Sequence, residues 1–177
     1  MEVQIRKLCP EESNSYRKMR LECLKNYPFN FTSDFNTEKE KVKLFFQSSI
    51  EASDPNNFVI GAYNGYDLIG ISGFNRYKKI KIAHKGRIIQ VYVSPNYQRQ
   101  NIGLRLIKYT IEEAFKISGI EQIEIAAIAT NKNAERLYKK IGFIEYGTQK
   151  NFMKVDNTYY DHKMMILFKN QYISVLN

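Results

Sequence analysis

Between residues 87 and 141 the sequence alternates twice between strand-like and helix-like segments. The run RIIQVYV (87–93) is rich in β-branched residues and precedes a helical pattern over 101–118, and the strand-like IEQIEIAAI (120–128) precedes a second helical pattern over 132–141. Two strands joined through a helix can lie parallel, since the connection crosses back over the sheet. This unit therefore predicts a sheet with at least one parallel pair of strands.

The flanking segments predict antiparallel pairing. NNFVIGAYN and DLIGISGFNRY are separated only by Gly65 and Tyr66, which is typical of a hairpin, and FIEYGTQKNF and TYYDHKMMILF form a second such pair near the end. A short first strand covers Val3 to Leu8, and a helix begins near Pro10. The order β-α-α-β-β-β-α-β-α-β-β predicts an α/β protein (an α+β mixed sheet) whose central, mostly antiparallel sheet carries helices on both faces.

The second helix of this order has its own start signal. Thr37 and Glu40 form a T-x-x-E capping box. Behind it, apolar residues recur at helical spacing, at Val42, Phe45, Phe46 and Ile50. We therefore expect one helix that starts after Thr37 and buries these side chains.

Size and composition indicate a single domain over 1–177. The chain has 177 residues, of which 44% are hydrophobic, enough for one substantial core. No apolar run approaches the ~20 residues of a membrane span, and the first residues lack a signal-peptide core, so we expect a cytoplasmic protein without a membrane partner. Cys9, Cys23, His84 and His162 are too scattered for a zinc site, and we predict no metal.

The net charge of +9 is concentrated in one part of the chain. No acidic residue occurs between Asp67 and Glu112, whereas this window carries nine bases, and the rest of the chain is balanced. A local positive field attracts an anionic ligand, either nucleic acid or a small polyphosphate. A basic surface that serves only solubility is the alternative.

Inside this window, the stretch VYVSPNYQRQNIGLRL (91–106) passes from a strand through a polar turn into a helix. The first turn of a helix has unpaired backbone N–H groups and a partial positive charge, which together favour anions. The turn from Gln98 to Gly103 is therefore predicted to hold a phosphate group.

A second stretch, ATNKNAERLYKKIGF, follows the next strand. It opens at Asn131, places Ala134, Tyr138 and Ile141 on one helical face, and stops at Gly142. On spacing alone, Asn131 is either a helix cap or a ligand-binding residue, and Tyr138 is either core or part of a site.

With both stretches in place, the chain resembles the GNAT superfamily of N-acetyltransferases. The family's phosphate-loop pattern, [QR]-x-x-G-x-[GA], appears as QRQNIG at 98–103 after V-x-P-x-Y at 93–97. The family's second pattern, N-x-x-A-x-x-x-Y-x-x-x-G-F, matches at Asn131, Ala134, Tyr138, Gly142 and Phe143. The resemblance in fold covers roughly residues 2–168, and its motifs lie within 91–143.

The resemblance implies acetyl-CoA as co-substrate and assigns residues to it. Main-chain groups of Tyr92 and Val93, and the side chain of Asn131, would bind the pantetheine arm. Tyr138 would be the catalytic residue, near the thioester sulfur, where it donates to the departing thiolate. The pyrophosphate would lie on Gln98, Arg99, Gln100, Asn101, Ile102 and Gly103, with Leu104 and Arg105 beginning the helix beneath it.

The sequence departs from the family pattern at two positions. Asn101 stands where the loop usually has its first glycine, and asparagine tolerates left-handed backbone better than most residues. Gln90 stands where many relatives carry a glutamate that acts as general base, and an amide cannot accept the proton. Another residue acting through water is the alternative base.

The resulting expectation is an acetyl-CoA-dependent N-acetyltransferase that transfers the acetyl group directly to an amine in a ternary complex. The acceptor is a small molecule or a peptide N-terminus, with a polyamine, an amino acid, an antibiotic amine and a protein N-terminus all open. Two rivals are a non-catalytic acyl-CoA sensor, which Gln90 favours, and a nucleic-acid-binding domain, which the position of the basic charges disfavours. We expect no nucleic-acid partner, and a homodimer is left open.

Overall fold

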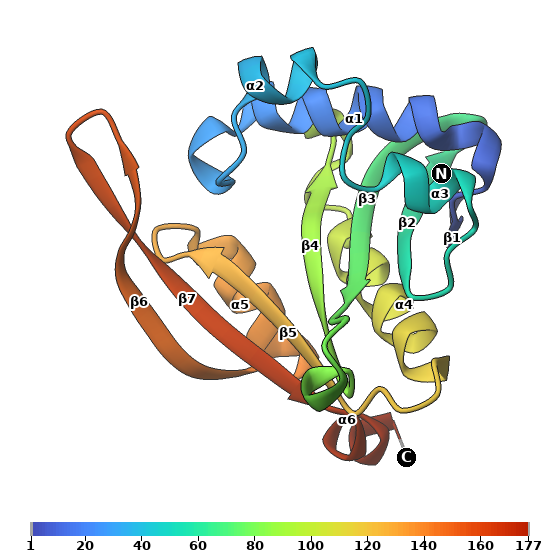
Figure 1. Ribbon diagram of the computed structural model, residues 1–177, viewed down its shortest axis with the longest axis vertical. Coiled ribbons are helices and arrows are strands. Elements are labelled where there is room, and N and C mark those ends of the chain that lie inside the picture. Colours follow the sequence, from blue (N-terminus) through green and yellow to red (C-terminus); the bar gives the residue numbers. More distant parts are fainter. Residues whose placement is uncertain (1, 177) are drawn as a thin grey trace.

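The computed structural model describes residues 2–176 and contains one seven-stranded sheet (Figure 1). Its strands are β1 (Val3–Lys7), β2 (Asn57–Asn64), β3 (Asp67–Arg76), β4 (Lys85–Val93), β5 (Gln122–Ile128), β6 (Ile144–Val155) and β7 (Thr158–Phe168). Its α-helices are α1 (Ser13–Asn26), α2 (Phe35–Glu40), α3 (Gln47–Glu51), α4 (Ile102–Lys116), α5 (Lys132–Ile141) and α6 (Lys169–Leu176). Single 3-10 turns lie at Pro10–Glu12, Pro28–Asn30, Ile80–Ile82 and Pro95–Tyr97.

The strand order is β1-β2-β3-β4-β5-β7-β6, and β4 and β5 are the parallel pair. The two hairpins and the other neighbours are antiparallel. The predicted fold class, a mixed and mostly antiparallel sheet, is therefore confirmed. The parallel pair lies where the helix-containing connection 94–121 was expected to produce it.

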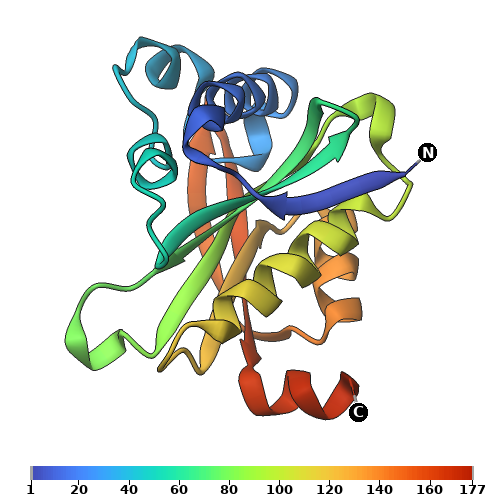
Figure 2. The same ribbon diagram turned by 90° about the vertical axis from the view of Figure 1, so that its right-hand side faces the viewer.

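Helices cover both faces of this sheet (Figures 1 and 2). One core cluster joins α4 and α5 to Ile60, Ile123 and other strand residues, while a second joins α1 and α3 to Val59 and Ile71. The consecutive residues Val59 and Ile60 belong to different clusters because successive side chains of a strand point to opposite faces. Both faces of β2 are apolar for this reason, and all but the last residue of this strand are buried.

Two local predictions in the segment before β2 are wrong. Asp34, not Thr37, caps α2: its carboxylate accepts the Thr37 N–H at 2.9 Å, so Thr37 lies within the first turn. The chain then becomes extended at Lys41, and α3 is a separate short helix. As a result Val42 is 95% exposed and Phe45 52% exposed, while Phe46 and Ile50 are buried. Helix α6 was not predicted.

Strands β4 and β5 pair at one end only. Lys85, Gly86 and Arg87 align with Gln122, Ile123 and Glu124, and beyond these three pairs the strands diverge (Figure 1). Near the divergence β4 carries a bulge, because the register with β3 shifts between Ile89 and Tyr92. At the bulge Gln90 adopts a left-handed backbone, with φ of 60°. Within residues 2–176, no helix has the length and apolar character needed to cross a membrane.

Candidate functional site

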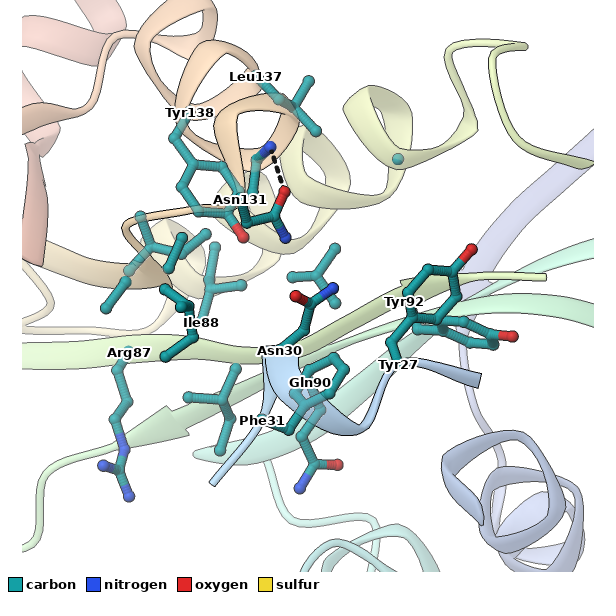
Figure 3. A pocket seen from close by; sticks show the side chains of 18 of the residues that line it. Tyr27, Asn30, Phe31, Arg87, Ile88, Gln90, Tyr92, Asn131, Leu137 and Tyr138 are labelled. Atoms are coloured by element: carbon teal, nitrogen blue, oxygen red, sulfur yellow. Dashed lines mark hydrogen bonds between the residues drawn. The ribbon is translucent and has the colours of Figure 1, made fainter. Parts of the chain in front are cut away.

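A cavity of about 1170 Å³ opens where β4 and β5 separate. We call its inner half the part lined by segments 91–104 and 131–138, which contain the two sequence motifs. We call its outer half the part lined by segments 20–45, 77–90 and 146–164 together with Glu124. Strand β4 lines both halves, with its residues up to Gln90 in the outer half and those from Val91 onward in the inner half. Figure 3 shows this strand with labelled residues of both halves around it.

The turn before α4 forms the end wall of the inner half. Arg99 and Asn101 both have left-handed backbone, with φ of 61° and 60°. The first helical hydrogen bond runs from the Arg105 N–H to the Asn101 carbonyl at 3.1 Å. The preceding N–H groups of Ile102, Gly103 and Leu104 therefore have no partner within the helix, and these three residues line the cavity. Free N–H groups at the positive end of a helix suit an anionic group.

The structure gives the remaining residues of this turn different surroundings. The Gln98 side chain donates to the Val93 carbonyl at 2.9 Å and to the Tyr27 hydroxyl at 2.8 Å, so it ties the turn to β4 and to the end of α1. Gln98 and Arg99 line the cavity, whereas Gln100 and Arg105 do not. The Arg105 guanidinium instead donates to the Val3 carbonyl at 2.7 Å, which fixes α4 against β1.

The open edge of β4 offers main-chain groups to the cavity. The Ser94 N–H donates to the Ile69 carbonyl at 2.9 Å, and Ile71 aligns with Tyr92. Because hydrogen-bonded pairs alternate in an antiparallel ladder, the main chain of Tyr92 faces β3 and that of Val93 faces the gap toward β5. Tyr92 lines the cavity as well, with its hydroxyl donating to Glu22 at 2.8 Å.

Helix α5 supplies the facing wall. The Asn131 carboxamide oxygen accepts the Ala134 N–H at 3.1 Å, so Asn131 caps the helix, while its amide nitrogen has no hydrogen-bond partner in the described part of the chain. Tyr138 is 6% exposed, and its hydroxyl points into the cavity near Asn131 (Figure 3). Burial raises the pKa of Tyr138, which keeps the phenol protonated at neutral pH. Both residues thus combine a structural position with a polar atom at the cavity.

Gln90 belongs to the outer half, and its side chain is bonded to a residue that does not line the cavity. Its carboxamide oxygen accepts a hydrogen bond from the Tyr16 hydroxyl at 2.8 Å, and Tyr16 is fully buried. The two carboxylates that line the cavity are also engaged. Glu38 pairs with Lys41 at 2.5 Å, and Glu124 accepts from the Tyr77 hydroxyl at 2.6 Å and from Lys85 at 3.2 Å.

The outer half contains residues that the sequence did not single out as a site. His162 of β7 lines the cavity and stacks on Phe152, with ring centroids 4.0 Å apart. Burial lowers the pKa of His162, so the imidazole is neutral at pH 7 and able to accept a proton. The aromatic loop NYPFNF (26–31) also contributes Tyr27, Asn30 and Phe31 to the lining of the cavity.

The basic window does not gather around the turn. Lys78, Lys79 and Lys81 surround the 3-10 turn that precedes β4, whereas Arg99 and Asn101 follow β4 at its other end. A strand of nine residues spans roughly 30 Å. The bases of this window therefore cannot all act on one small ligand, and of them Arg87 and Arg99 line the cavity. The described residues contain no group of three or more potential metal ligands.

Comparisons with known proteins agree with this geometry. A sequence model described as the acetyltransferase (GNAT) family matches residues 18–143. An N-alpha-acetyltransferase from Sulfurisphaera tokodaii is 27% identical over 128 residues, covering 71% of this chain and 70% of that protein. A spermidine N(1)-acetyltransferase from Vibrio cholerae is 24% identical over 96 residues, covering 54% of this chain and 56% of that protein. The chain thus spans little more than half of the latter enzyme.

Solved structures resemble the whole fold. A GNAT-family acetyltransferase from Streptococcus pneumoniae superposes with a TM-score of 0.78 at 20% identity, covering 94% of this chain and 99% of that chain. A putative acetyltransferase from Salmonella typhimurium, solved with its cofactor acetyl-CoA, gives a TM-score of 0.78 at 16% identity, covering 95% and 94%.

Proposed function

The chain belongs to the GNAT acetyltransferase family, and we propose that it transfers an acetyl group from acetyl-CoA directly to an acceptor amine held in the same cavity. One observation carries this proposal. The cavity that opens between β4 and β5 is lined at one end by residues 102–104, whose N–H groups are unpaired within α4, and the Tyr138 hydroxyl points into the same cavity. An elongated ligand with a phosphate at one end and a reactive group at the other fits this arrangement.

Each residue of the inner half has a distinct part in the proposal. The N–H groups of residues 102–104 bind the pyrophosphate, since they are free and lie at the positive end of α4. The Val93 main chain and the free amide nitrogen of Asn131 bind the arm of the ligand between β4 and α5. The acetyl thioester supplies the activated acyl group when acetyl-CoA is bound.

Tyr138 then acts on the leaving sulfur. A thiol has a pKa near ~8.5 and an ordinary phenol near ~10. Burial raises the pKa of Tyr138 further, so complete proton transfer to the thiolate is uphill. The hydroxyl instead donates a hydrogen bond that strengthens as charge develops on the sulfur, an interaction that favours the transition state over the ground state.

The surroundings of the two cysteines support direct transfer, because neither is suited to carry the acetyl group. Burial raises the pKa of Cys23 to about 12, which leaves almost no thiolate at neutral pH. Cys9 is exposed and does not line the cavity. Neither thiol is placed to carry an acetyl group between the two substrates, so a ternary complex is the arrangement that we infer.

The acceptor amine must lose a proton, and Gln90 cannot take it. His162 is the group in the outer half that we propose for this step, acting directly or through water, because its imidazole is neutral at pH 7. Positioning two bound substrates contributes in addition, up to ~7–11 kcal/mol in favourable cases.

The proposal is tested in two stages. Thermal unfolding with CoA and acetyl-CoA should show a higher melting temperature, because a ligand that binds only the folded state stabilises it. Release of CoA from acetyl-CoA, followed with a thiol reagent over a panel of amines, should then show turnover. Binding without turnover on any amine would favour the acyl-CoA sensor, which Gln90 also favours. Failure of millimolar CoA to shift the melting temperature would remove both functions.

A further inference from the structure

Arg20 is a buried cation in the outer half without a carboxylate partner. It lies on α1, lines the cavity, and is 3% exposed. One terminal nitrogen donates weakly to the Cys23 sulfur at 3.7 Å, and the guanidinium carbon lies 4.7 Å from the centre of the Phe31 ring. The Nε atom is buried and has no hydrogen-bond partner in the described part of the chain.

Such a group is costly unless something pairs with it. A buried charge requires a counterion and hydrogen bonds to offset the loss of its hydration. A thiol and an aromatic face satisfy few of the five N–H donors of a guanidinium. The geometry of these donors matches a carboxylate in particular, through two parallel hydrogen bonds.

The chain itself offers no carboxylate for this role among the described residues. Glu38 is the buried acid on the neighbouring helix α2, but its carboxylate pairs with Lys41 at 2.5 Å rather than with Arg20. Glu124 is bonded to Tyr77 and Lys85. The outer half therefore holds one unpaired buried cation and no unpaired carboxylate.

We propose that Arg20 binds a carboxylate carried by the acceptor, so that the substrate is a primary amine that also bears a carboxylate. The inference rests on the proposed function, since it concerns the acceptor of that reaction. The same chemistry occurs in a free amino acid and in a peptide with an acidic residue beside its N-terminus. A polyamine does not fit, because it would bring an ammonium group toward an unpaired guanidinium.

The test compares matched acceptors on the purified enzyme with acetyl-CoA. The panel contains amino acids with their primary amides, peptides with Glu or Gln at the second position, and spermidine. We expect kcat/KM for the preferred carboxylate acceptor to exceed that for its amide by about ten- to hundredfold, the usual effect of one charge-assisted hydrogen-bonded pair. The amino-acid and peptide arms identify the source of the carboxylate.

Variants of α1 then show whether the preference for a carboxylate acceptor depends on Arg20. Arg20→Gln should raise KM for the carboxylate acceptor by about tenfold or more and leave KM for acetyl-CoA and the rate with the amide unchanged. Lys18→Gln removes an exposed charge from the same helix and should change none of these values. If Arg20→Gln folds poorly, Arg20→Met, which fills similar space without a charge, serves in its place.

The outcomes distinguish a failure of the Arg20 inference from a failure of the proposed acetyltransferase function. Preference for spermidine over every carboxylate acceptor, or equal losses in the Arg20 and Lys18 variants, would overturn this inference while leaving the acetyltransferase intact. Acetyl-CoA binding without turnover on any amine would instead overturn the proposed function.

Discussion

The two halves of the cavity are built in different ways. The inner half comes from segments 91–104 and 131–138 and offers backbone atoms to the cavity, namely the N–H groups at the start of α4 and the Val93 main chain. The outer half brings together side chains from three distant segments and from β5, such as Arg20, Phe31, Glu124 and His162. A backbone site tolerates many side chains as long as its dihedral angles are preserved, whereas a side-chain site changes its ligand with each substitution. This difference explains how one fold can retain a cofactor and vary its acceptor.

The largest effect that we expect tests the part in the reaction that we propose for Tyr138, a side chain of the inner half. Tyr138→Phe keeps the ring packed and removes the hydroxyl, so kcat should fall by roughly tenfold to a thousandfold with little change in acetyl-CoA binding or thermal stability. Steady-state kinetics and calorimetry on the same preparation measure both. Tyr66→Phe, at a fully exposed turn, is the matched control. A Tyr138→Phe enzyme with full kcat would reduce Tyr138 to a packing residue.

The second prediction tests whether CoA binding at the turn before α4 depends on the backbone conformation of Asn101. Asn101 has φ of 60° and ψ of 11°, a conformation that glycine adopts freely and a β-branched residue resists by about 1–2 kcal/mol. Asn101→Gly should leave CoA affinity unchanged or improve it, and Asn101→Val should weaken it by roughly five- to thirtyfold.

Calorimetric titration with CoA measures this series. Gln100→Val is its control, since Gln100 is exposed and its φ is not positive. Equal affinities for Asn, Gly and Val at position 101 would mean that the turn does not depend on this backbone conformation.

The third prediction concerns the point where the halves meet. Gln90→Ala keeps the left-handed bulge but leaves the buried Tyr16 hydroxyl without its acceptor, which should cost about 1–3 kcal/mol of unfolding free energy. For a chain of this length the melting temperature should drop by roughly 2–12 °C. Gln90→Glu retains an acceptor oxygen and should lose less. If Gln90→Ala melts like the wild type, the bond to Tyr16 contributes nothing to the bulge.

The smallest effect that we expect is the pH dependence of stability that arises from His162 in the outer half. Burial lowers the pKa of His162 in the folded protein below its ordinary value of 6.5, so the unfolded chain binds the proton first as the pH falls. Stability should therefore decrease as the pH drops through 6.5 and level off below the folded pKa. Because His162 is only half buried, the change should be smaller than that of Gln90→Ala.

Melting temperatures measured from about pH 8 down to about pH 5, the interval in which a histidine changes its charge, reveal this slope. His162→Asn removes the titrating group and should flatten this slope. A slope that persists unchanged in His162→Asn would assign it to other groups.

Sequence patterns predicted the inner half better than the outer half for physical reasons. Residues 98–103 and 131–142 are contiguous stretches whose caps, glycines and helical spacing are local properties, and these stretches fold as expected. The roles assigned to Asn131 and Tyr138 stay predictions. His162 and Arg20 carry no local signal, because the cavity that they line is assembled from segments that lie far apart in the sequence, at 20–45, 77–90 and 146–164. Thr37 misled because Asp34, three residues earlier, captured the same helix start.

The early separation of β4 from β5 also affects how the sheet avoids pairing with other extended chains. An unpaired strand edge attracts other extended chains, and proteins usually confine such edges to the rim of a sheet, blunted by charges or prolines. Here an edge lies at the middle of the strand order, along β4 beyond Arg87. This edge lines the cavity, which Asn131 at the start of α5 and Tyr138 within that helix line as well. A slender ligand with a few amide groups can complete the ladder, and while bound it closes an edge that the fold leaves open.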